Sequence, residues 1–379
     1  MKKWMLALLA MLLTLMCTVA AADVSGDWKY WRLPDGTVEI TDYTGSETEL
    51  IVPGELGGRT VTRIGDLAFS MCKSLKSITL PDSVTSIGFC AFSHCESLKS
   101  ITLPDSLTTI GNLAFDSCEK LTGVMLPDSL TFIGELAFFG CKKLTGIIIP
   151  DSLTFIGDYA FSGCESLTSI ELPDSLLSIG AGAFSNTGLT SITIPASVTF
   201  IGEGFCHTSS LKAIHVSPDN PVFAVVDSAL FNMQEMVLLQ YPAAASAARY
   251  TVPQGTLRIG VNAFCSSDLT EVILPDSVTS IGDSAFIGCF DLKSVNIPDS
   301  VTTIGEEAFY HCRNLKSVTL PASLTDIAMD AFENCPATFS VISGTYAEEW
   351  CIENDREYVS TEPASDPESL IRKIFDSVF

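Results

Sequence analysis

Basic residues are scarce in this chain of 379 residues, in which 21 Lys and Arg stand against 45 Asp and Glu. The formal net charge is −24, and the sequence offers no cluster of Lys and Arg that could bind phosphates. This balance excludes nucleic acid as a partner, and an anionic membrane surface would repel the chain for the same reason. The simplest interpretation of the acidic surplus is solubility.

The usual sequence signatures of catalysis are also absent. Only four histidines occur, and the chain has no His-x-x-x-His, Cys-x-x-Cys, Gly-x-Ser-x-Gly or phosphate-binding glycine loop. His94 and His311 occupy the same position of a repeat described below, but nine coils separate them. We therefore expect a non-enzymatic protein with no catalytic residues, no cofactor and no metal site.

Long hydrophobic runs are missing outside the first 22 residues. There, Lys2 and Lys3 precede an apolar run from Met5 to Met16, and small alanines lead to Asp23. This pattern is typical of a secretory signal peptide, and the run is too short to span a bilayer. Lipidation at Cys17 is a weaker interpretation, because Met16 stands where a small residue is expected before a lipidated cysteine. The sequence predicts an exported protein, secreted or held at the cell surface.

One phrase recurs eleven times: Ile-Gly-x-x-Ala-Phe-x-x-Cys-x-x-Leu-x-x-Ile-x-Leu-Pro-Asp-Ser-Leu. Its first isoleucine recurs mostly every 23 or 22 residues, at Ile64, Ile87, Ile110, Ile133, Ile156, Ile179, Ile201, Ile259, Ile281, Ile304 and Ile327. A period in the low twenties predicts a solenoid in which each coil stacks on the last.

Within one coil, residues 98–103 alternate as a strand does, with Ile101 and Leu103 inward. Pro104-Asp105-Ser106 predicts a turn, residues 107–110 a second short extended piece, and residues 112–118 a helical turn with Ala114 and Phe115 inward. Gly111 relieves the backbone at the corner between the last two.

Cysteine is concentrated in one column of this repeat. Eight of the 13 cysteines share it: Cys72, Cys95, Cys118, Cys141, Cys164, Cys289, Cys312 and Cys335. A column repeated in every coil indicates an inward ladder, and Thr187, Thr208 and Ser267 near the same position show that sulfur is not required. We favour free buried thiols over vertical disulfides between coils, which the stacking distance would also allow.

The repeat is similar to the BspA-type leucine-rich repeats of exported surface proteins, over roughly Trp28 to Tyr358. Leu75, Ile78 and Leu80 fit the general leucine-rich pattern, whereas Ser83 replaces its Asn or Cys. The resemblance implies a right-handed leucine-rich-repeat β-solenoid of about eleven coils of 22–23 residues, with short parallel strands and capped at both ends. It also implies adhesion to host proteins or to other cells.

The predicted organisation follows from where the repeat starts, breaks and stops. We expect a signal peptide (1–22), an N-terminal β cap (23–62), repeats (63–211), an extended repeat with a β insertion (212–258), repeats (259–336), a C-terminal cap (337–358) and an acidic tail with a short amphipathic helix (359–379). The insertion is either a tolerated excursion or a loop that shapes a ligand site. A helix over Thr345 to Asn354, burying Trp350 and Ile352, would close the last coil.

An aspartate follows the repeat proline in most coils, at Asp82, Asp105, Asp128, Asp151, Asp174, Asp276 and Asp299. Stacked carboxylates of this kind could attract Ca²⁺. We favour the alternative that each Asp caps its own turn, because Ala196 and Ala322 replace it without disturbing the repeat.

Two neighbouring coils depart from the polar pattern of exposed positions. Large apolar residues stand where other coils have Ser or Thr, at Met125, Phe132, Phe139, Ile148 and Phe155, and Phe200 is a weaker candidate. We interpret the first five as an apolar patch that contacts a protein partner, against the alternative of repeat drift in which Phe132 and Phe155 stack on each other.

The sequence thus predicts a secreted or cell-surface binding protein whose partner is a protein on host or neighbouring cells. The competing hypothesis is a structural envelope or matrix component that self-assembles through its flat face or its tail.

Overall fold

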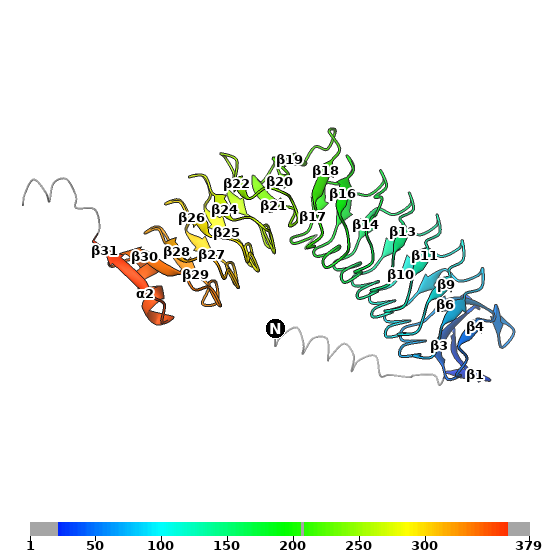
Figure 1. The fold of residues 1–379 in the computed structure, drawn as a ribbon. Coiled ribbons are helices and arrows are strands. Elements are labelled where there is room, and N and C mark those ends of the chain that lie inside the picture. The colour runs from blue at the N-terminus through cyan, green and yellow to red at the C-terminus, as the bar shows by residue number, and fades with distance from the viewer. Residues whose placement is uncertain (1–21, 206–207, 363–379) are drawn as a thin grey trace, which may run out of the picture.

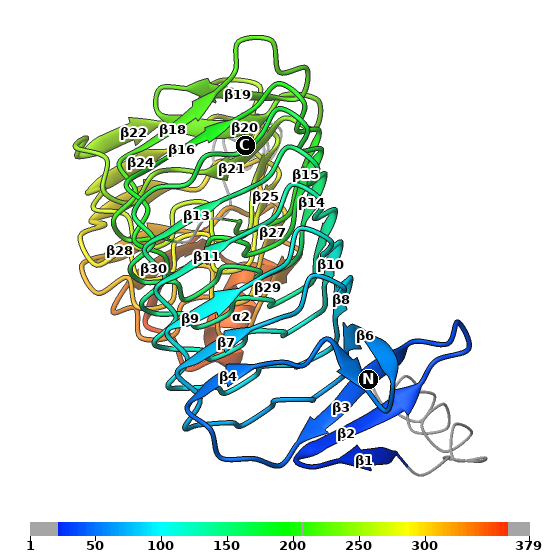
Figure 2. The ribbon, with the colours of Figure 1, turned by 90° about the vertical axis from the view of Figure 1, so that its right-hand side faces the viewer.

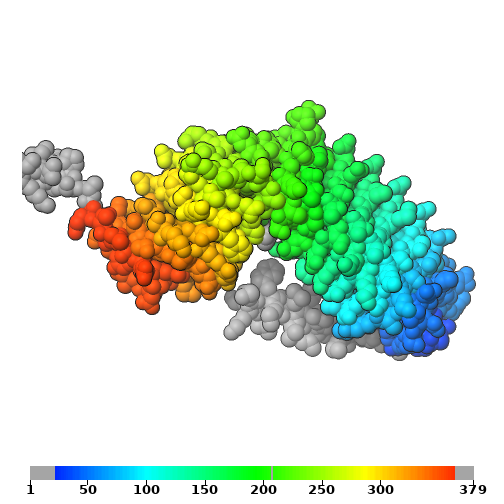
Figure 3. Space-filling view, viewed as in Figure 1, coloured from blue at the N-terminus to red at the C-terminus, as the bar shows by residue number. Residues whose placement is uncertain are grey.

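The computed structural model describes residues 22–205 and 208–362. The predicted signal peptide and the predicted tail helix lie, apart from Ala22, outside the described residues. The described chain forms an arched solenoid of about 14 turns with parallel strands, so the predicted fold class is confirmed (Figures 1 and 3). No helix in the described ranges is long and apolar enough to cross a membrane.

Most coils contribute one short strand to each of two separate ladders. The first ladder, which we call the strand face, carries β4 (Glu49–Ile51), β7 (Ser77–Thr79), β9 (Ser100–Thr102), β11 (Gly123–Met125), β13 (Gly146–Ile148), β16 (Ser191–Ile194), β18 (Ala213–Val216), β22 (Arg249–Thr251), β24 (Glu271–Ile273), β26 (Ser294–Asn296), β28 (Ser317–Thr319), β30 (Thr338–Ile342) and β31 (Tyr358–Thr361). Its inward residues are buried, and its outward residues are exposed.

The second ladder, which we call the corner ladder, precedes the repeat's Ile-Gly corner. It comprises β8 (Ser86–Ile87), β10 (Thr109–Ile110), β12 (Phe132–Ile133), β14 (Phe155–Ile156), β15 (Ser178–Ile179), β17 (Phe200–Ile201), β23 (Arg258–Ile259), β25 (Ser280–Ile281), β27 (Thr303–Ile304) and β29 (Asp326–Ile327). Figure 2 shows the two ladders on different sides of the coil, with β7, β9 and β11 apart from β8 and β10.

The turn count exceeds the eleven repeats because three turns without the consensus stack in register with it. Ile40 pairs with Ile64, Leu238 pairs with Ile259, and the last turn carries α2 (Tyr346–Glu353). Helix α2 buries Trp350, as expected, whereas Ile352 is exposed. A turn can therefore form a coil without the consensus sequence, provided that its strand pairs in register and its apolar residues are buried.

The N-terminal end is closed by antiparallel strands that lead into the parallel ladder. They are β1 (Asp23–Ser25), β2 (Trp28–Arg32), β3 (Val38–Tyr43), β5 (Glu55–Leu56) and β6 (Arg59–Ile64). Asp35-Gly36 lies between β2 and β3, which pair antiparallel. Ile40, Tyr43 and Val52 are buried and supply the apolar cover that a terminal coil needs.

The segment after each corner is not a helical turn, contrary to the expectation for residues 112–118. Ala114, Asp116 and Cys118 make tight-turn hydrogen bonds to the residue three positions earlier. The N–H groups of Leu113, Phe115 and Ser117 donate instead to the next coil, at 2.7 to 2.9 Å. Leu113 and Ser117 have φ values of 56° and 57°, and this left-handed backbone directs their N–H groups towards the next coil. Contacts between coils thus override a helix, which would direct these donors into its own coil.

Stacked phenylalanines form the centre of the core. Six rings from consecutive coils stack with centroids 5.0 to 5.8 Å apart: Phe69, Phe92, Phe115, Phe138, Phe161 and Phe184. Four more stack in the C-terminal half at 4.7 to 4.9 Å: Phe264, Phe286, Phe309 and Phe332. A ring inside either stack contacts one ring on each side, so no coil's core is complete alone.

The cysteine column lies inside this core as free thiols at Cys95, Cys118, Cys141, Cys164, Cys289 and Cys312. Each thiol donates to the carbonyl of a phenylalanine in the preceding coil, for example Cys118 Sγ to Phe92 O at 3.2 Å. Thr208 Oγ1 makes the same kind of bond to Phe184 O at 3.1 Å. The column therefore requires a small hydrogen-bond donor, which explains why Thr can replace Cys.

The insertion separates two hydrophobic cores at the crown of the arch (Figure 1). It contains β19 (Phe223–Val226), β20 (Ala229–Asn232) and β21 (Val237–Gln240), which pair antiparallel in sequence, and β21 then pairs parallel with β23. Leu230 packs in the N-terminal core, whereas Ala229 and Phe231 pack in the C-terminal core. Strand β20 is thus a shared wall between the cores.

Candidate binding surfaces

A hollow on the strand face lies over the two coils that depart from the repeat. This groove has a volume of about 1020 Å³ and extends from Ile101 across β11 and β13 to Pro173. Met125 and Ile148 pair in register within it and are 86% and 79% exposed. Such exposure of large apolar side chains is the mark of a surface that a partner covers.

Two glycines form the floor of the groove. Gly123 and Gly146 pair in register, and a Cβ built on either would meet nothing within 4 Å. Other coils place Ser77 or Ser100 at this position, so the glycines remove side chains from the surface instead of relieving the backbone. The strand ladder also stops here, because β13 reaches the next coil only through the single bridge Ile148 to Glu171.

The charges around the groove have one sign. Asp128, Asp151 and Glu171 are among its lining residues, and none of the lining residues is Lys or Arg. The sequence identified Met125 and Ile148 as departures from the repeat, but it did not show that Asp128, Asp151 and Glu171 lie around the same hollow. The signal for the departures was Gly-x-Met and Gly-x-Ile in consecutive coils, since both positions of each pair depart from the repeat together.

The other candidate residues lie elsewhere on the coil. Phe132 and Phe155 belong to the corner ladder, where their rings stack with centroids 6.2 Å apart, and Phe132 is 39% exposed. Phe139, 38% exposed, lies in the turn segment that follows the corner. The structure therefore brings Met125 and Ile148 together, and Phe132 and Phe155 together, but it does not gather the five residues into one patch.

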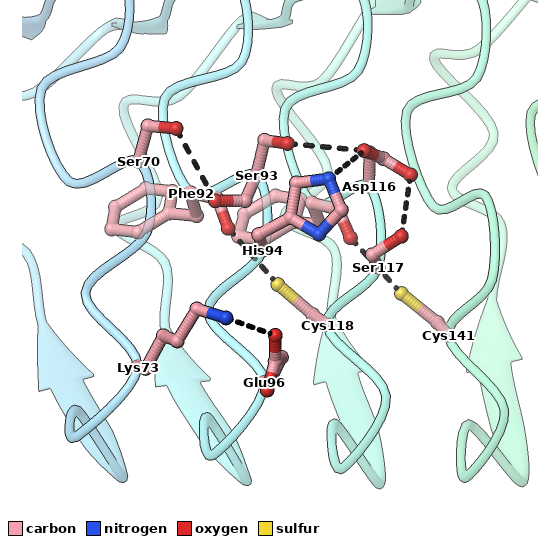
Figure 4. A network of polar contacts seen from close by, with 11 residues as sticks. Ser70, Lys73, Phe92, Ser93, His94, Glu96, Asp116, Ser117, Cys118 and Cys141 are labelled. Carbon is pink, nitrogen blue, oxygen red and sulfur yellow. Dashed lines mark hydrogen bonds and ion pairs between the residues drawn. The ribbon is translucent and has the colours of Figure 1, made fainter.

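A polar cluster around Asp116 contains Ser, His and Asp side chains (Figure 4). The Asp116 carboxylate is nearly buried and accepts hydrogen bonds from Ser93 Oγ at 3.0 Å and Ser117 Oγ at 2.9 Å, while His94 Nε2 lies 3.6 Å away. Neither serine hydroxyl bonds to His94. Because an activated serine must donate to the histidine, this geometry serves packing between coils and is no hydrolase relay.

The aspartate column does not cap its turns, contrary to the interpretation favoured above. The following serine makes the stabilising bond, as when Ser129 Oγ donates to Leu107 O of the preceding coil at 2.6 Å. Within the described ranges, the carboxylates of Asp82, Asp105, Asp128 and Asp151 accept no hydrogen bond, and no group of three or more His, Cys, Asp or Glu could hold a metal.

Comparison with known proteins agrees with this architecture. Residues 55–154, 131–247 and 240–355 match the family described as BspA type leucine rich repeat region. The crystal structure of a leucine rich cell surface protein from Faecalibacterium prausnitzii A2-165 is similar to this chain, with 33% sequence identity and a TM-score of 0.81. The alignment covers 93% of this chain and 97% of that protein's chain.

The pneumococcal vaccine antigen PcpA shares the fold, with 22% identity over 92% of this chain and 100% of its own and a TM-score of 0.61. No curated protein matches the chain.

Proposed function

This chain belongs to the BspA-type leucine-rich repeat family, and we propose that it is an extracellular adhesion protein that binds a partner protein in its strand-face groove. Families with this repeat are generally non-enzymatic binding proteins associated with the cell surface. The similar structure from F. prausnitzii is described as a cell surface protein, which supports the same location for this chain.

The groove is the single observation that carries the proposal. Its apolar rim, open floor and three carboxylates require a partner that presents apolar side chains flanked by Lys or Arg. Among the described residues, the other large apolar side chains exposed on this face are Ile51 in the N-terminal cap, Ile273 in the C-terminal half, and Tyr358 and Val359 in β31 at the end. Apolar contact would supply affinity, and the carboxylates would select partners of opposite charge.

The test restores the repeat consensus in the groove. Met125→Thr and Ile148→Thr introduce the residue found at Thr79 and Thr102, so the fold is preserved. We expect this double variant to lose at least tenfold in affinity for a protein captured from extracellular-matrix or cell-surface extracts, because two anchors of about 1.5 kcal/mol or more leave the interface. The measurement is a pull-down followed by titration of the captured protein.

Two matched variants decide the location. Gly123→Ser and Gly146→Ser should also weaken binding, because new side chains fill the floor without meeting protein atoms. Ile273→Thr changes the same repeat position outside the groove and should leave affinity unchanged. Equal binding by the groove variants and the parent would overturn the groove as the site, and loss through Phe132→Ser with Phe155→Ser would relocate it to the corner ladder.

A self-assembling structural component is the second candidate, and one observation favours it. Strand β31 ends the described part of the strand face, all four of its residues are exposed, and among the described strands it pairs with β30 alone. An open strand edge can pair with another chain. Concentration-dependent assembly in sedimentation, with no captured partner, would favour this function over adhesion.

A further inference from the structure

The corner ladder has a backbone rule that holds at almost every coil. Two carbonyls of each coil accept N–H groups of the next coil, as Thr85 O accepts from Thr108 N and Ile87 O from Gly111 N, both at 2.9 Å. The C-terminal half has the same hydrogen bonds: Thr302 N donates to Thr279 O and Gly305 N donates to Ile281 O, both at 2.9 Å. Each coil is therefore a template for the next.

Within the described residues, the two bonds are missing in two places: at β12, which still pairs with β14, and at β17, where the strand pairing itself stops. Among the described strands β17 pairs only with β15, and the carbonyls of Thr199 and Ile201 receive no N–H from the following coil. The cause at β17 is the insertion, because the β19–β20 hairpin is wedged between the two cores and β21 restarts the ladder on its far side. Figure 1 shows β17 and β21 on either side of this break.

A cavity of about 510 Å³ occupies the place of the missing rung. Its walls are β17 on one side and the residues of β19 to β23 on the other. Phe200 is 59% exposed here, and the largely buried side chains of Val222 and Phe223 line the opposite wall. Glu235 accepts a hydrogen bond from Arg258 at 2.8 Å across the lining, so these charges are already paired. The volume falls within the range of about 300–1,000 Å³ typical of ligand sites.

We propose that this cavity binds an extended peptide segment of a partner protein, which adds to β17 as a parallel strand. The free acceptors indicate the chemistry of the ligand. In other coils the two equivalent carbonyls accept N–H groups that stand three residues apart on an extended chain, and a threonine hydroxyl often donates to the first carbonyl as well. The exposed ring of Phe200 would pack against an apolar side chain of that segment. This site is separate from the groove and independent of the function proposed for it.

A peptide with the sequence of one of the chain's own coils can serve as the probe. A capped synthetic peptide of residues 299–307 contains Thr302 and Gly305, whose N–H groups cover the equivalent carbonyls in the C-terminal half. We expect saturable binding to the chain from residue 23 onward, measured by fluorescence anisotropy. A peptide that is N-methylated at Thr302 and Gly305 keeps its side chains but loses the two backbone N–H donors. Its affinity should be at least about tenfold lower.

Variants of the protein locate the binding. Phe200→Ser introduces the residue found at Ser178 and Ser280 and should weaken the peptide several-fold, because an apolar wall of the cavity is lost. Phe155→Ser is the matched control, since it lies in the same column on a coil whose ladder continues, and it should have no effect. Absence of binding, equal binding of the N-methylated peptide, or equal loss in both variants would overturn the proposal. Failure here leaves the groove result unaffected.

Discussion

Raising the pH from about 8 to about 10 is expected to destabilise this solenoid by several kcal/mol through its cysteine ladder. Burial raises the pKa of Cys164 to about 12 and that of Cys289 to about 11, and it raises the pKa of Cys141 and Cys312 as well. A thiol in the unfolded chain has a pKa of about 8.5.

The direction follows from which state can release the proton. Below about pH 8.5 both states hold it, and the ladder's contribution to stability is present in full. As the pH rises towards the folded values, the unfolded chain ionises while the buried thiols stay protonated. Each such thiol then removes about 1.4 kcal/mol from the free energy of unfolding for every pH unit. Several thiols acting together approach the whole stability of an ordinary domain.

Chemical denaturation under reducing conditions at several pH values measures this slope. The matched variant replaces Cys118, Cys141 and Cys164 by Ser, which keeps a donor for the phenylalanine carbonyls, as Thr208 does, but does not ionise in this range. Its stability should depend less steeply on pH than that of the parent. An unchanged slope would show that other groups dominate. In a parallel unfolding experiment without reductant, cysteines that resist alkylation would indicate vertical disulfides instead.

Replacing Phe138 by Ala is expected to cost about 3–5 kcal/mol, the largest effect of a single substitution in the repeats. The ring is fully buried and stacks on Phe115 at 5.1 Å and Phe161 at 5.4 Å, so both neighbouring coils lose a contact. Stability in a solenoid is transmitted between adjacent coils. The loss should therefore spread through the N-terminal core.

Hydrogen exchange measures which coils lose stability in the Phe138→Ala variant. Because β20 separates the cores, protection should fall on the N-terminal side of the insertion and persist over residues 259–335. Phe132→Ala is the control, since this ring is partly exposed on the same coil, and it should cost less than about 1.5 kcal/mol. Equal destabilisation by both variants would contradict the central role of the stacked rings, and loss of protection on both sides of β20 would contradict the separation of the cores.

Much of the fold could be predicted from the sequence because a solenoid repeats one local solution. The period set the coil length, the alternation at residues 98–103 gave the strand, and the shared column placed Cys118 inside. The candidate site was predicted only in part. Departures from the consensus identified Met125 and Ile148, but a list of departures carries no information on which side of the coil each one lies.

The sequence by itself determined the repeat, the two-strand coil and the inward ladders, since these depend on periodicity and burial within about 23 residues. Only the tertiary structure decided how coils meet. It turned the expected helix at residues 112–118 into turns that donate to the next coil, divided the five apolar candidates among separate surfaces, and left Thr199 and Ile201 without a following rung. The physical reason is that these features depend on hydrogen bonds and packing between coils, which no single copy of the repeat contains.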